Sequence, residues 1–187
     1  SKTNQLELKT SFFDTISLVP EADWNQVPHP GNVLLSIPYL RAMEQGLSDR
    51  MDFRYLIFYN TQLQPVGLAA IQILNFIDQG NKYGEVMCKL TNKAKHTLLG
   101  TVDFKVMVCG NAFACGEHGF AFSPEVPLKE GLANLSNALF KLRRAEAING
   151  NVPLVLMKEF WPQHFEESQG LKKNGFKDFQ IDVNMVL

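Results

Sequence analysis

Apolar and polar positions fall into blocks along the chain, and the clearest blocks lie between Phe53 and Phe76. The run 53–59 is aromatic and aliphatic, the segment 60–65 is polar and ends in proline, and the run 66–76 is again apolar. Two strand-like runs joined by a short polar segment are typical of a β-hairpin with a longer loop. The pattern therefore predicts a central hairpin over these residues.

Helical spacing is visible in other parts of the chain, where apolar residues recur every three or four positions. It predicts a helix over 34–47, with Ser36 as N-cap, and a helix after Pro124 and Pro127 that ends at Asn149-Gly150. A further helix is expected over 162–174. An irregular loop is expected over 27–32, and a short helix at 92–99 within a polar excursion over 79–101.

Short apolar runs predict the remaining strands, which are expected at 12–18, 105–109, 120–122, 152–157 and 176–187. The run 152–157 is continuously apolar, which suits a strand covered on both faces. The resulting order of elements predicts an α/β (α+β) fold, in which helices cover a mixed sheet. We expect one domain over residues 1–187, since chains of this length usually form one.

Composition narrows the classes of function. The chain has a net charge of −1, so no general electrostatic field attracts nucleic acid or an anionic membrane. Cys88, Cys109 and Cys115 form neither a disulfide framework nor a common zinc pattern, and no metal is expected. The start of the chain is polar, and no run reaches the ~20 apolar residues of a membrane span. A cytoplasmic location is expected.

Several short strings resemble one family. They are Trp24 before a Pro/Asn loop, Leu35-Ser36-x-x-Tyr39-Leu40, Pro65-Val66-Gly67, Cys109-Gly110-Asn111, Gly116-x-x-Gly119 and Asp182-Val183-Asn184-Met185-Val186. In this order, over nearly the whole chain, they resemble the GNAT-like acyltransferases, nearest the peptidoglycan-biosynthesis or Fem-type peptidyltransferases. Proteins of that group usually contain two GNAT-like halves, and this chain resembles the first.

The resemblance implies a mostly antiparallel sheet flanked by helices, with an acyl thioester held between strands 105–109 and 152–157. It also implies transfer of an acyl or aminoacyl group to the amine of a small molecule or peptide. The donor would be acyl-CoA or, as the one expected nucleic-acid partner, aminoacyl-tRNA. A second GNAT-like half or a homodimer partner would complete the cleft.

The helix that follows residue 127 departs from the family pattern. GNAT proteins usually bind the pyrophosphate of CoA with a glycine-rich loop at this helix start, where backbone N–H groups and the helix dipole favour an anion. This chain has Pro124, Glu125, Pro127 and Glu130 there, which remove donors and add negative charge. Lys129 is the one residue of this stretch that favours a phosphate.

The segment 110–119 is the best candidate for a binding site, because it follows an inner strand, where open α/β sheets tend to bind ligands. Cys109, Gly110, Asn111, Gly116 and Gly119 are the candidate cofactor-binding residues, since glycines let the backbone approach a phosphate or thioester. The competing interpretation is a hairpin turn with two tight bends.

The candidate catalytic residues are Glu117, His118, Glu159 and Tyr59. A carboxylate or imidazole can accept the proton of an attacking amine, and a tyrosine can donate one. Glu117 and His118 are adjacent and are expected to face opposite ways, so they would not act as a pair. For Glu159, the alternative is a strand-end ion pair with Lys158, and for Tyr59 it is a place in the core.

Two functional hypotheses follow. The chain is either an N-acyltransferase acting on an amine, or a degenerate, non-catalytic GNAT-like domain that binds a partner or dimerises. The departure at the helix start favours the second hypothesis, and the family resemblance favours the first.

Overall fold

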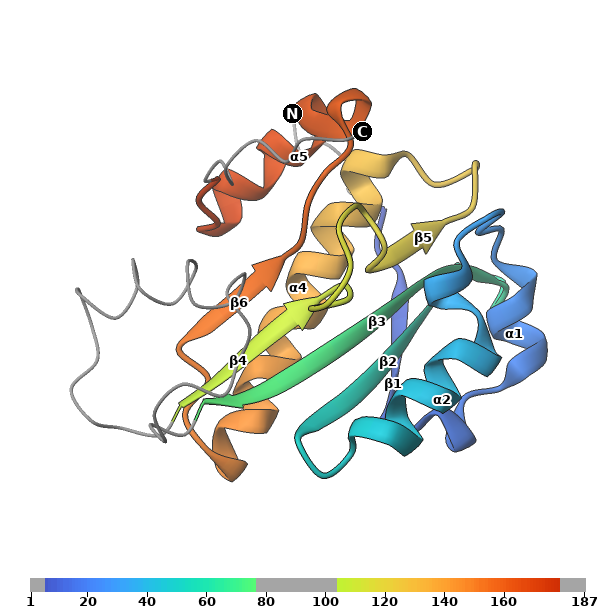
Figure 1. Ribbon diagram of the computed structural model, residues 1–187. Helices are drawn as coiled ribbons and strands as arrows, with labels where there is room; N and C mark the ends of the chain where they lie inside the picture. The colour runs from blue at the N-terminus through green and yellow to red at the C-terminus, as the bar shows by residue number, and fades with distance from the viewer. Residues whose placement is uncertain (1–5, 77–103, 179–187) are drawn as a thin grey trace, which may run out of the picture.

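The computed structural model describes residues 6–76 and 104–178 and has a six-stranded open sheet at its centre (Figure 1). The strand order is β1-β2-β3-β4-β6, and β5 also pairs with β3. The strands are β1 (Lys9–Phe13), β2 (Met51–Tyr59), β3 (Pro65–Phe76), β4 (Phe104–Cys109), β5 (Phe120–Phe122) and β6 (Leu154–Met157). All pairings are antiparallel except that of β4 with β6. The predicted mixed sheet is confirmed.

The β2–β3 hairpin lies where the apolar pattern predicts it, with a register that runs from Met51 opposite Leu74 to Tyr59 opposite Pro65. Asn60 forms the turn, because its side-chain Oδ1 accepts from the backbone N–H groups of Gln62 and Gln64 at 3.0 Å each. An asparagine that replaces missing backbone partners in this way is a common turn device.

One face of the sheet is covered by α1 (Glu21–Gln26) and α2 (Ile37–Leu47). Trp24 of α1 is fully buried, and its indole N–H donates to the backbone carbonyl of Leu35 at 2.7 Å. Glu44 of α2 accepts from the Tyr55 hydroxyl at 2.8 Å and from the backbone N–H of Ile16 at 2.9 Å. The Glu44–Tyr55 bond ties α2 to β2, and the Trp24–Leu35 bond ties α1 to the segment before α2, although the sequence pattern did not predict α1.

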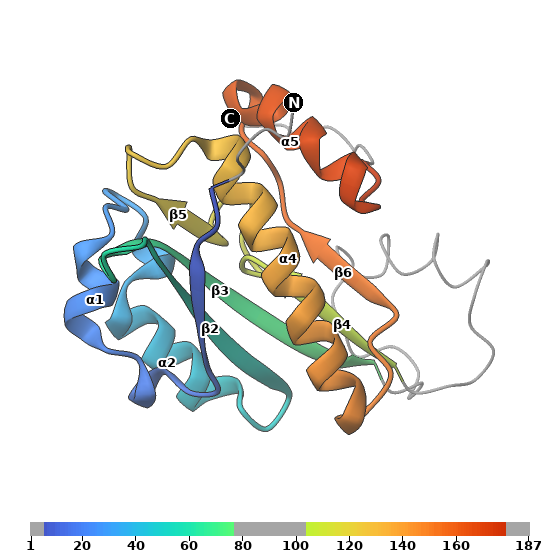
Figure 2. The same cartoon turned by 180° about the vertical axis from the view of Figure 1, so that it is seen from behind.

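The other face is covered by α4 (Leu128–Glu146) (Figure 2). The short helix α5 (Phe165–Ser168) comes later in the chain, after β6. Phe122 of β5 lies between the sheet and α4. A Cβ atom on Gly67 would lie 2.4 Å from its ring, and one on Gly131 would lie 2.8 Å away. Both glycines are therefore required by close packing around this ring.

Several predicted elements differ in the structure. The strand expected at 12–18 is wrong: β1 is Lys9–Phe13, and the chain then forms a 3₁₀ helix, Ile16–Leu18, capped by Thr15. A second 3₁₀ helix, Val33–Leu35, precedes α2. The helix expected at 162–174 is three pieces: a 3₁₀ helix Pro162–His164, then α5, then a 3₁₀ helix Gln169–Asn174. Helix α4 ends at Glu146, and a 3₁₀ turn, Ala147–Asn149, leads to Gly150.

Strand β6 was expected to be covered on both faces, and this expectation is also wrong. Leu154 is 37% exposed and the three residues after it are only half-buried, because β6 is the last strand beyond β4 among the described residues. The helix expected at 92–99 and most of the strand region 176–187 lie outside the described residues. No helix within the described part of the chain is long and apolar enough to cross a membrane.

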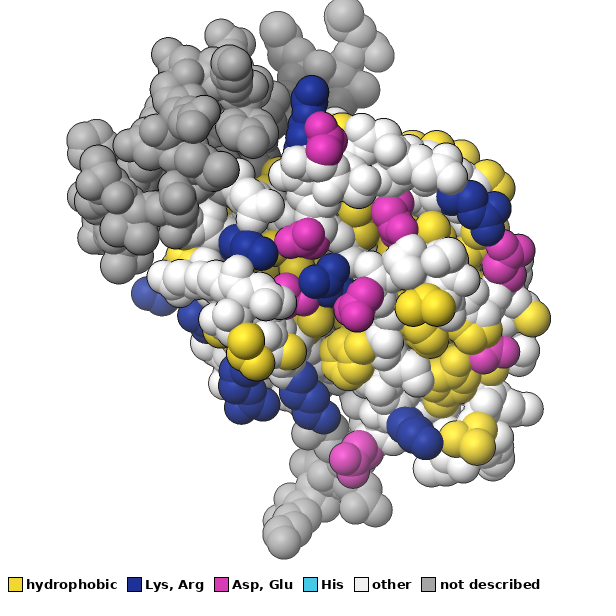
Figure 3. All heavy atoms as spheres, turned by 90° about the horizontal axis from the view of Figure 1, so that it is seen from below, with side chains coloured by type: hydrophobic (Ala, Val, Ile, Leu, Met, Phe, Trp, Pro, Cys, Tyr) yellow, Lys and Arg dark blue, Asp and Glu magenta, His cyan; other side chains and the backbone are white. Residues whose placement is uncertain are grey.

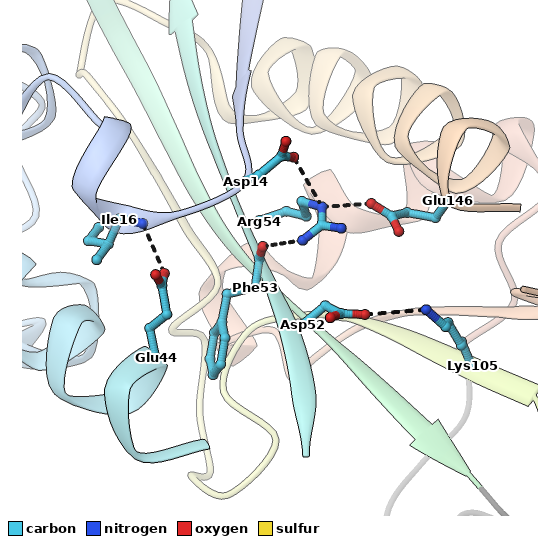
Figure 4. Close-up of polar contacts among 8 residues, drawn as sticks. All are labelled: Asp14, Ile16, Glu44, Asp52, Phe53, Arg54, Lys105 and Glu146. Atoms are coloured by element: carbon cyan, nitrogen blue, oxygen red, sulfur yellow. Dashed lines mark hydrogen bonds and ion pairs between the residues drawn. The ribbon is translucent and has the colours of Figure 1, made fainter. Parts of the chain in front are cut away.

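Acidic and basic side chains are mixed on the face that Figure 3 shows. Five charged residues form contacts near the C-terminal end of α4, here called the charged cluster: Asp14, Asp52, Arg54, Lys105 and Glu146 (Figure 4). Arg54 of β2 donates through Nε to Glu146 at 2.6 Å, and Lys105 of β4 lies 3.3 Å from Asp52. The Arg54–Glu146 pair joins β2 to α4, and the Lys105–Asp52 pair joins β4 to β2.

Candidate functional site

The parallel pair β4–β6 places two loops side by side. In this pair Cys109 lies opposite Met157, and the backbone N–H of Lys158 still donates to the carbonyl of Cys109 at 3.1 Å. Beyond this point β4 continues into residues 110–119, the glycine loop, and β6 into residues 158–164, the lysine loop. Open α/β sheets bind ligands outside the carboxyl ends of their strands, so these two loops form the candidate site.

The glycine loop leaves and rejoins the sheet at one residue of β3. The backbone N–H of Gly110 donates to the Ala70 carbonyl at 3.2 Å, and the Ala70 N–H donates to the Gly119 carbonyl at 2.9 Å. A Cβ atom on Gly119 would lie 2.7 Å from the Cys109 backbone, so only glycine fits there. Gly110, with φ +131°, makes the turn out of β4.

Charged side chains of the lysine loop hold the glycine loop in place. The Lys158 ammonium donates to the backbone carbonyls of Asn111, at 3.0 Å, and Ala114. The Glu159 carboxylate accepts from the backbone N–H of Gly116 and lies 3.8 Å from the Lys158 ammonium. Glu159 adopts φ +42°, which is uncommon for a residue with a side chain. The expected strand-end ion pair is therefore present, and both partners also bind loop backbone.

Glu117 and His164 form a carboxylate–imidazole pair between the two loops. The Oε1 atom of Glu117 lies 2.8 Å from Nδ1 of His164, and its Oε2 atom accepts from the backbone N–H of Trp161 at 3.0 Å. The Glu117 side chain is 8% exposed and that of His164 is 33% exposed. A buried carboxylate thus orients an imidazole that solvent and solutes can reach.

His118 does not pair with Glu117, in agreement with the prediction for these adjacent residues. Its ring meets the Trp161 ring edge-on at 6.2 Å, and its Nδ1 atom is buried with no hydrogen-bond partner among the described residues. The ring borders a narrow cavity under α2 that has room for about one water molecule.

The inner side of the glycine loop is fixed by amide side chains. Asn111 donates through Nδ2 to the Tyr39 hydroxyl at 2.7 Å and accepts through Oδ1 from the Phe113 N–H at 2.8 Å. Gln72 of β3 accepts from the Ala112 N–H at 2.8 Å. Asn111 and Gln72 are both buried, so their main role in this conformation is to satisfy the turn.

Cys109 and Lys129 are candidate cofactor-binding residues at the two ends of the expected donor site. Cys109 is buried, its thiol faces the Gly119 carbonyl at 3.7 Å, and burial raises its pKa to about 12. It stays a protonated thiol near neutral pH and is a poor nucleophile. The stem of Lys129 lies near Gly170, so the C-terminal helical pieces run past this side of the α4 start. The described residues contain no cluster of potential metal ligands.

Tyr59 is not brought together with the two loops. Its hydroxyl donates to Asp23 of α1 at 2.8 Å, on the face of the sheet opposite α4. Burial, followed by the contact with Asp23, raises its pKa to about 12. The Tyr59 hydroxyl donates its proton to Asp23 of α1, so this placement does not support Tyr59 as a proton donor at the glycine and lysine loops.

Sequence reasoning missed His164 and the backbone contacts of Lys158. His164 follows Glu117 by 47 positions and lies in a segment expected to be a regular helix, so no short motif joins the two residues. The available signal was indirect: Lys158 and Glu159 directly follow an apolar strand. Only the strand order, which places that strand next to β4, makes their position adjacent to the glycine loop.

Comparisons with known proteins give structural similarity alone. No protein family matches the sequence, and no curated protein matches it significantly. Among solved structures, a point mutant of the BH1408 protein from Bacillus halodurans is similar, with a TM-score of 0.52 and 9% identity over 97% of this chain and 99% of that chain. A tetramutant of BH1408 matches with a TM-score of 0.52 and 8% identity over 97% of this chain and 100% of that chain. At such identities the likeness concerns the fold.

Proposed function

We propose that the chain is an N-acyltransferase with a GNAT-like organisation, which transfers an acyl or aminoacyl group to an amine. One observation carries the proposal: the Glu117–His164 pair lies between the loops that follow the adjacent parallel strands β4 and β6. The family resemblance expects an acyl thioester between these two strands. The pair would therefore lie beside the donor carbonyl, where an amine has to lose a proton.

The chemistry follows from the orientation of the imidazole. If Nδ1 of His164 donates to Glu117, its Nε2 atom has a free lone pair that can accept a proton. The amine nitrogen would attack the acyl carbonyl and form the new C–N bond, and the bond from the carbonyl carbon to the thioester sulfur or the tRNA ester oxygen would break. The leaving group would accept a proton from protonated His164 and depart as a thiol or a tRNA hydroxyl. His164 would take the amine proton, and Glu117 would hold the imidazole in position and stabilise its charged form.

A second candidate is a degenerate domain that catalyses nothing, and a separate observation favours it. The Lys158 ammonium occupies two loop carbonyls beside the parting strands. The start of α4 follows Pro127, which has no N–H to offer an anion, and its first turn carries the acidic Glu130. Groups that a donor would use for binding are therefore engaged or absent.

The test is acyl transfer by the full chain, using acetyl-CoA or a long-chain acyl-CoA with a panel of primary amines, and aminoacyl-tRNA in a parallel assay. His164→Ala should lower the rate by about 10²–10⁴-fold, as expected for a general base. His29→Ala is the matched control and should keep the wild-type rate, because His29 bonds to the backbone carbonyl of Val27 in the loop before α2.

Binding of the donor is measured separately by the melting temperature. A donor at 100 times its dissociation constant adds about 2.7 kcal/mol of stability. Transfer that needs His164 but not His29 supports the acyltransferase. Absence of transfer and of any thermal shift with all donors rejects it in favour of the degenerate domain.

A further inference from the structure

The Glu117 carboxylate binds the lysine loop at two points. Its Oε2 atom accepts from the backbone N–H of Trp161 at 3.0 Å, and its Oε1 atom lies 2.8 Å from Nδ1 of His164. The lysine loop holds its own shape between these points, because the backbone N–H of His164 donates to the Trp161 carbonyl at 2.8 Å. Whether the carboxylate meets the imidazole therefore depends on where the glycine loop places Glu117.

The glycine loop is held at three backbone positions before Glu117. The Lys158 ammonium binds the carbonyls of Asn111 and Ala114, and the Glu159 carboxylate accepts from the backbone N–H of Gly116. An ammonium group has three donors and no acceptor, so one lysine can bridge two carbonyls and still face a carboxylate. Lys158 and Glu159 thus fix the backbone up to the residue that precedes Glu117.

No other cation on the two loops can replace Lys158. It is the only lysine or arginine in residues 110–119 and 158–164, and its side chain is only 14% exposed. Hydrogen bonds from a charged group are stronger than neutral ones, and burial protects them from screening by salt. Bonds from Asn111 to Tyr39 and from Ala112 to Gln72 hold the start of the loop, whereas Lys158 and Glu159 also act on its middle.

We propose that Lys158 is a positioning residue for His164. Together with Glu159, it acts through the glycine loop to bring the Glu117 carboxylate onto Nδ1 of the imidazole. Nδ1 then carries the proton, and Nε2 keeps its lone pair. That this imidazole is the base of acyl transfer rests on the proposed function, whereas its orientation by Lys158 does not.

Nuclear magnetic resonance of the ¹⁵N-labelled full chain measures this orientation without an acyl donor. The protonated and the lone-pair nitrogen of a neutral imidazole have different ¹⁵N shifts, and His164→Ala assigns the signals of His164 among the four histidines. We expect the Nδ1–H form to predominate in the wild type and its share to fall at least about twofold in Lys158→Met. An unchanged share in Lys158→Met, or a wild type in which the Nε2–H form predominates, would overturn the proposal.

Control variants separate positioning from a general loss of stability or charge. Glu146→Ala disturbs the charged cluster but none of the loop contacts, so it should keep the wild-type share of the Nδ1–H form. Lys172→Met removes a lysine from an exposed ion pair and should also keep it. Glu159→Ala should lower the share as Lys158→Met does, and it is the second test if Lys158→Met unfolds. An equal decrease in Glu146→Ala would overturn the proposal, because lost stability would then explain it.

Kinetics distinguish this inference from the proposed function. Lys158→Met should lower kcat of acyl transfer at least about tenfold and change KM little, because a misplaced base affects the transition state more than binding. If the wild type transfers no acyl group but the imidazole still follows Lys158, the proposed function is rejected and the positioning role stands. If transfer needs His164 but Lys158→Met keeps the wild-type tautomer and kcat, the positioning role alone is rejected.

Discussion

The charged cluster and the candidate site both hold charged side chains in partly buried positions, but they use them differently. In the cluster, charges on regular elements pair with one another, as Arg54 of β2 does with Glu146 of α4 at 2.6 Å. At the site, Lys158, Glu159 and Glu117 all bind backbone groups of irregular loops.

The physical reason for the difference is the state of the backbone. Strands and helices satisfy most of their own N–H and C=O groups, so nearby charged side chains pair mainly with other side chains, although Arg54 also donates to the Phe53 carbonyl at 2.7 Å. Loops leave backbone groups unpaired, and charged side chains can satisfy them. Burial and ion pairing alone therefore do not identify a site. The distinguishing feature is the imidazole of His164, which is oriented by Glu117 while its side chain is still 33% exposed.

Breaking the charged cluster should have the largest effect. Glu146→Ala leaves the Arg54 guanidinium, whose side chain is 15% exposed, with the exposed carboxylate of Asp14 at 3.4 Å and the Phe53 carbonyl at 2.7 Å. Removing one partner of a buried ion pair typically costs about 3–5 kcal/mol, so we expect a loss of about 3 kcal/mol in the free energy of unfolding. Urea unfolding monitored by circular dichroism measures it.

The control for this prediction is Glu21→Ala, which breaks the exposed pair with Arg41 and should change stability by less than about 1 kcal/mol. The double variant Arg54→Met/Glu146→Leu should regain most of the loss, because it leaves no unpaired charge. If Glu146→Ala were as mild as Glu21→Ala, the cluster would not act as a buried pair.

Lys158→Met should have the next largest effect, because it keeps the apolar stem but removes the donor to Asn111 and Ala114. Hydrogen bonds from charged groups contribute about 1.5–3 kcal/mol, and we expect a destabilisation in this range. Limited proteolysis should also cut the glycine loop faster. Lys172→Met, at an exposed pair with Asp178, should change neither property. Equal behaviour of the two variants would show that the loop is held by other contacts.

Glu159 allows backbone strain to be separated from its carboxylate contact. Both Glu159→Ala and Glu159→Gly remove the bond to Gly116, but only glycine adopts φ +42° without strain. The glycine variant should therefore be about 1 kcal/mol more stable than the alanine variant in urea unfolding. At Glu125, an exposed loop residue without a positive φ, glycine should bring no such gain. If the glycine variant were more stable than the alanine variant by the same amount at both positions, strain at Glu159 would be excluded.

The smallest effect is expected for the pH dependence that arises from Tyr59. Its pKa is raised to about 12 in the fold by burial and by Asp23, above the ordinary value of 10.0. The folded state therefore favours the neutral phenol. This contribution is fully present below about pH 10 and is lost as the pH rises towards about 12. The urea midpoint should fall over this window in the wild type and less steeply in Tyr59→Phe. If the urea midpoint fell equally steeply with pH in the wild type and in Tyr59→Phe, this pH dependence would not arise from Tyr59.

The apolar periodicity predicted the β2–β3 hairpin, β4, β5 and most of α2 and α4, because each has a local signal in strand or helix spacing. The same reasoning failed where tertiary contacts override the local pattern. Glu44 accepts hydrogen bonds from the Thr15 hydroxyl and from the backbone N–H of Ile16. The chain turns at these two residues, so the strand expected at 12–18 does not continue through them. Helix α1 has only six residues and too few positions to show a period.

For the candidate site, the sequence by itself determined that a glycine-containing loop follows an inner strand and that Lys158 and Glu159 follow another. Local composition carries this information, since strands and turns are specified over a few residues. The tertiary structure alone decided that the two strands are adjacent and parallel, that Glu117 meets His164 and not His118, and that Tyr59 belongs with α1. These outcomes depend on strand order and on contacts between residues far apart in the chain, which no local pattern encodes.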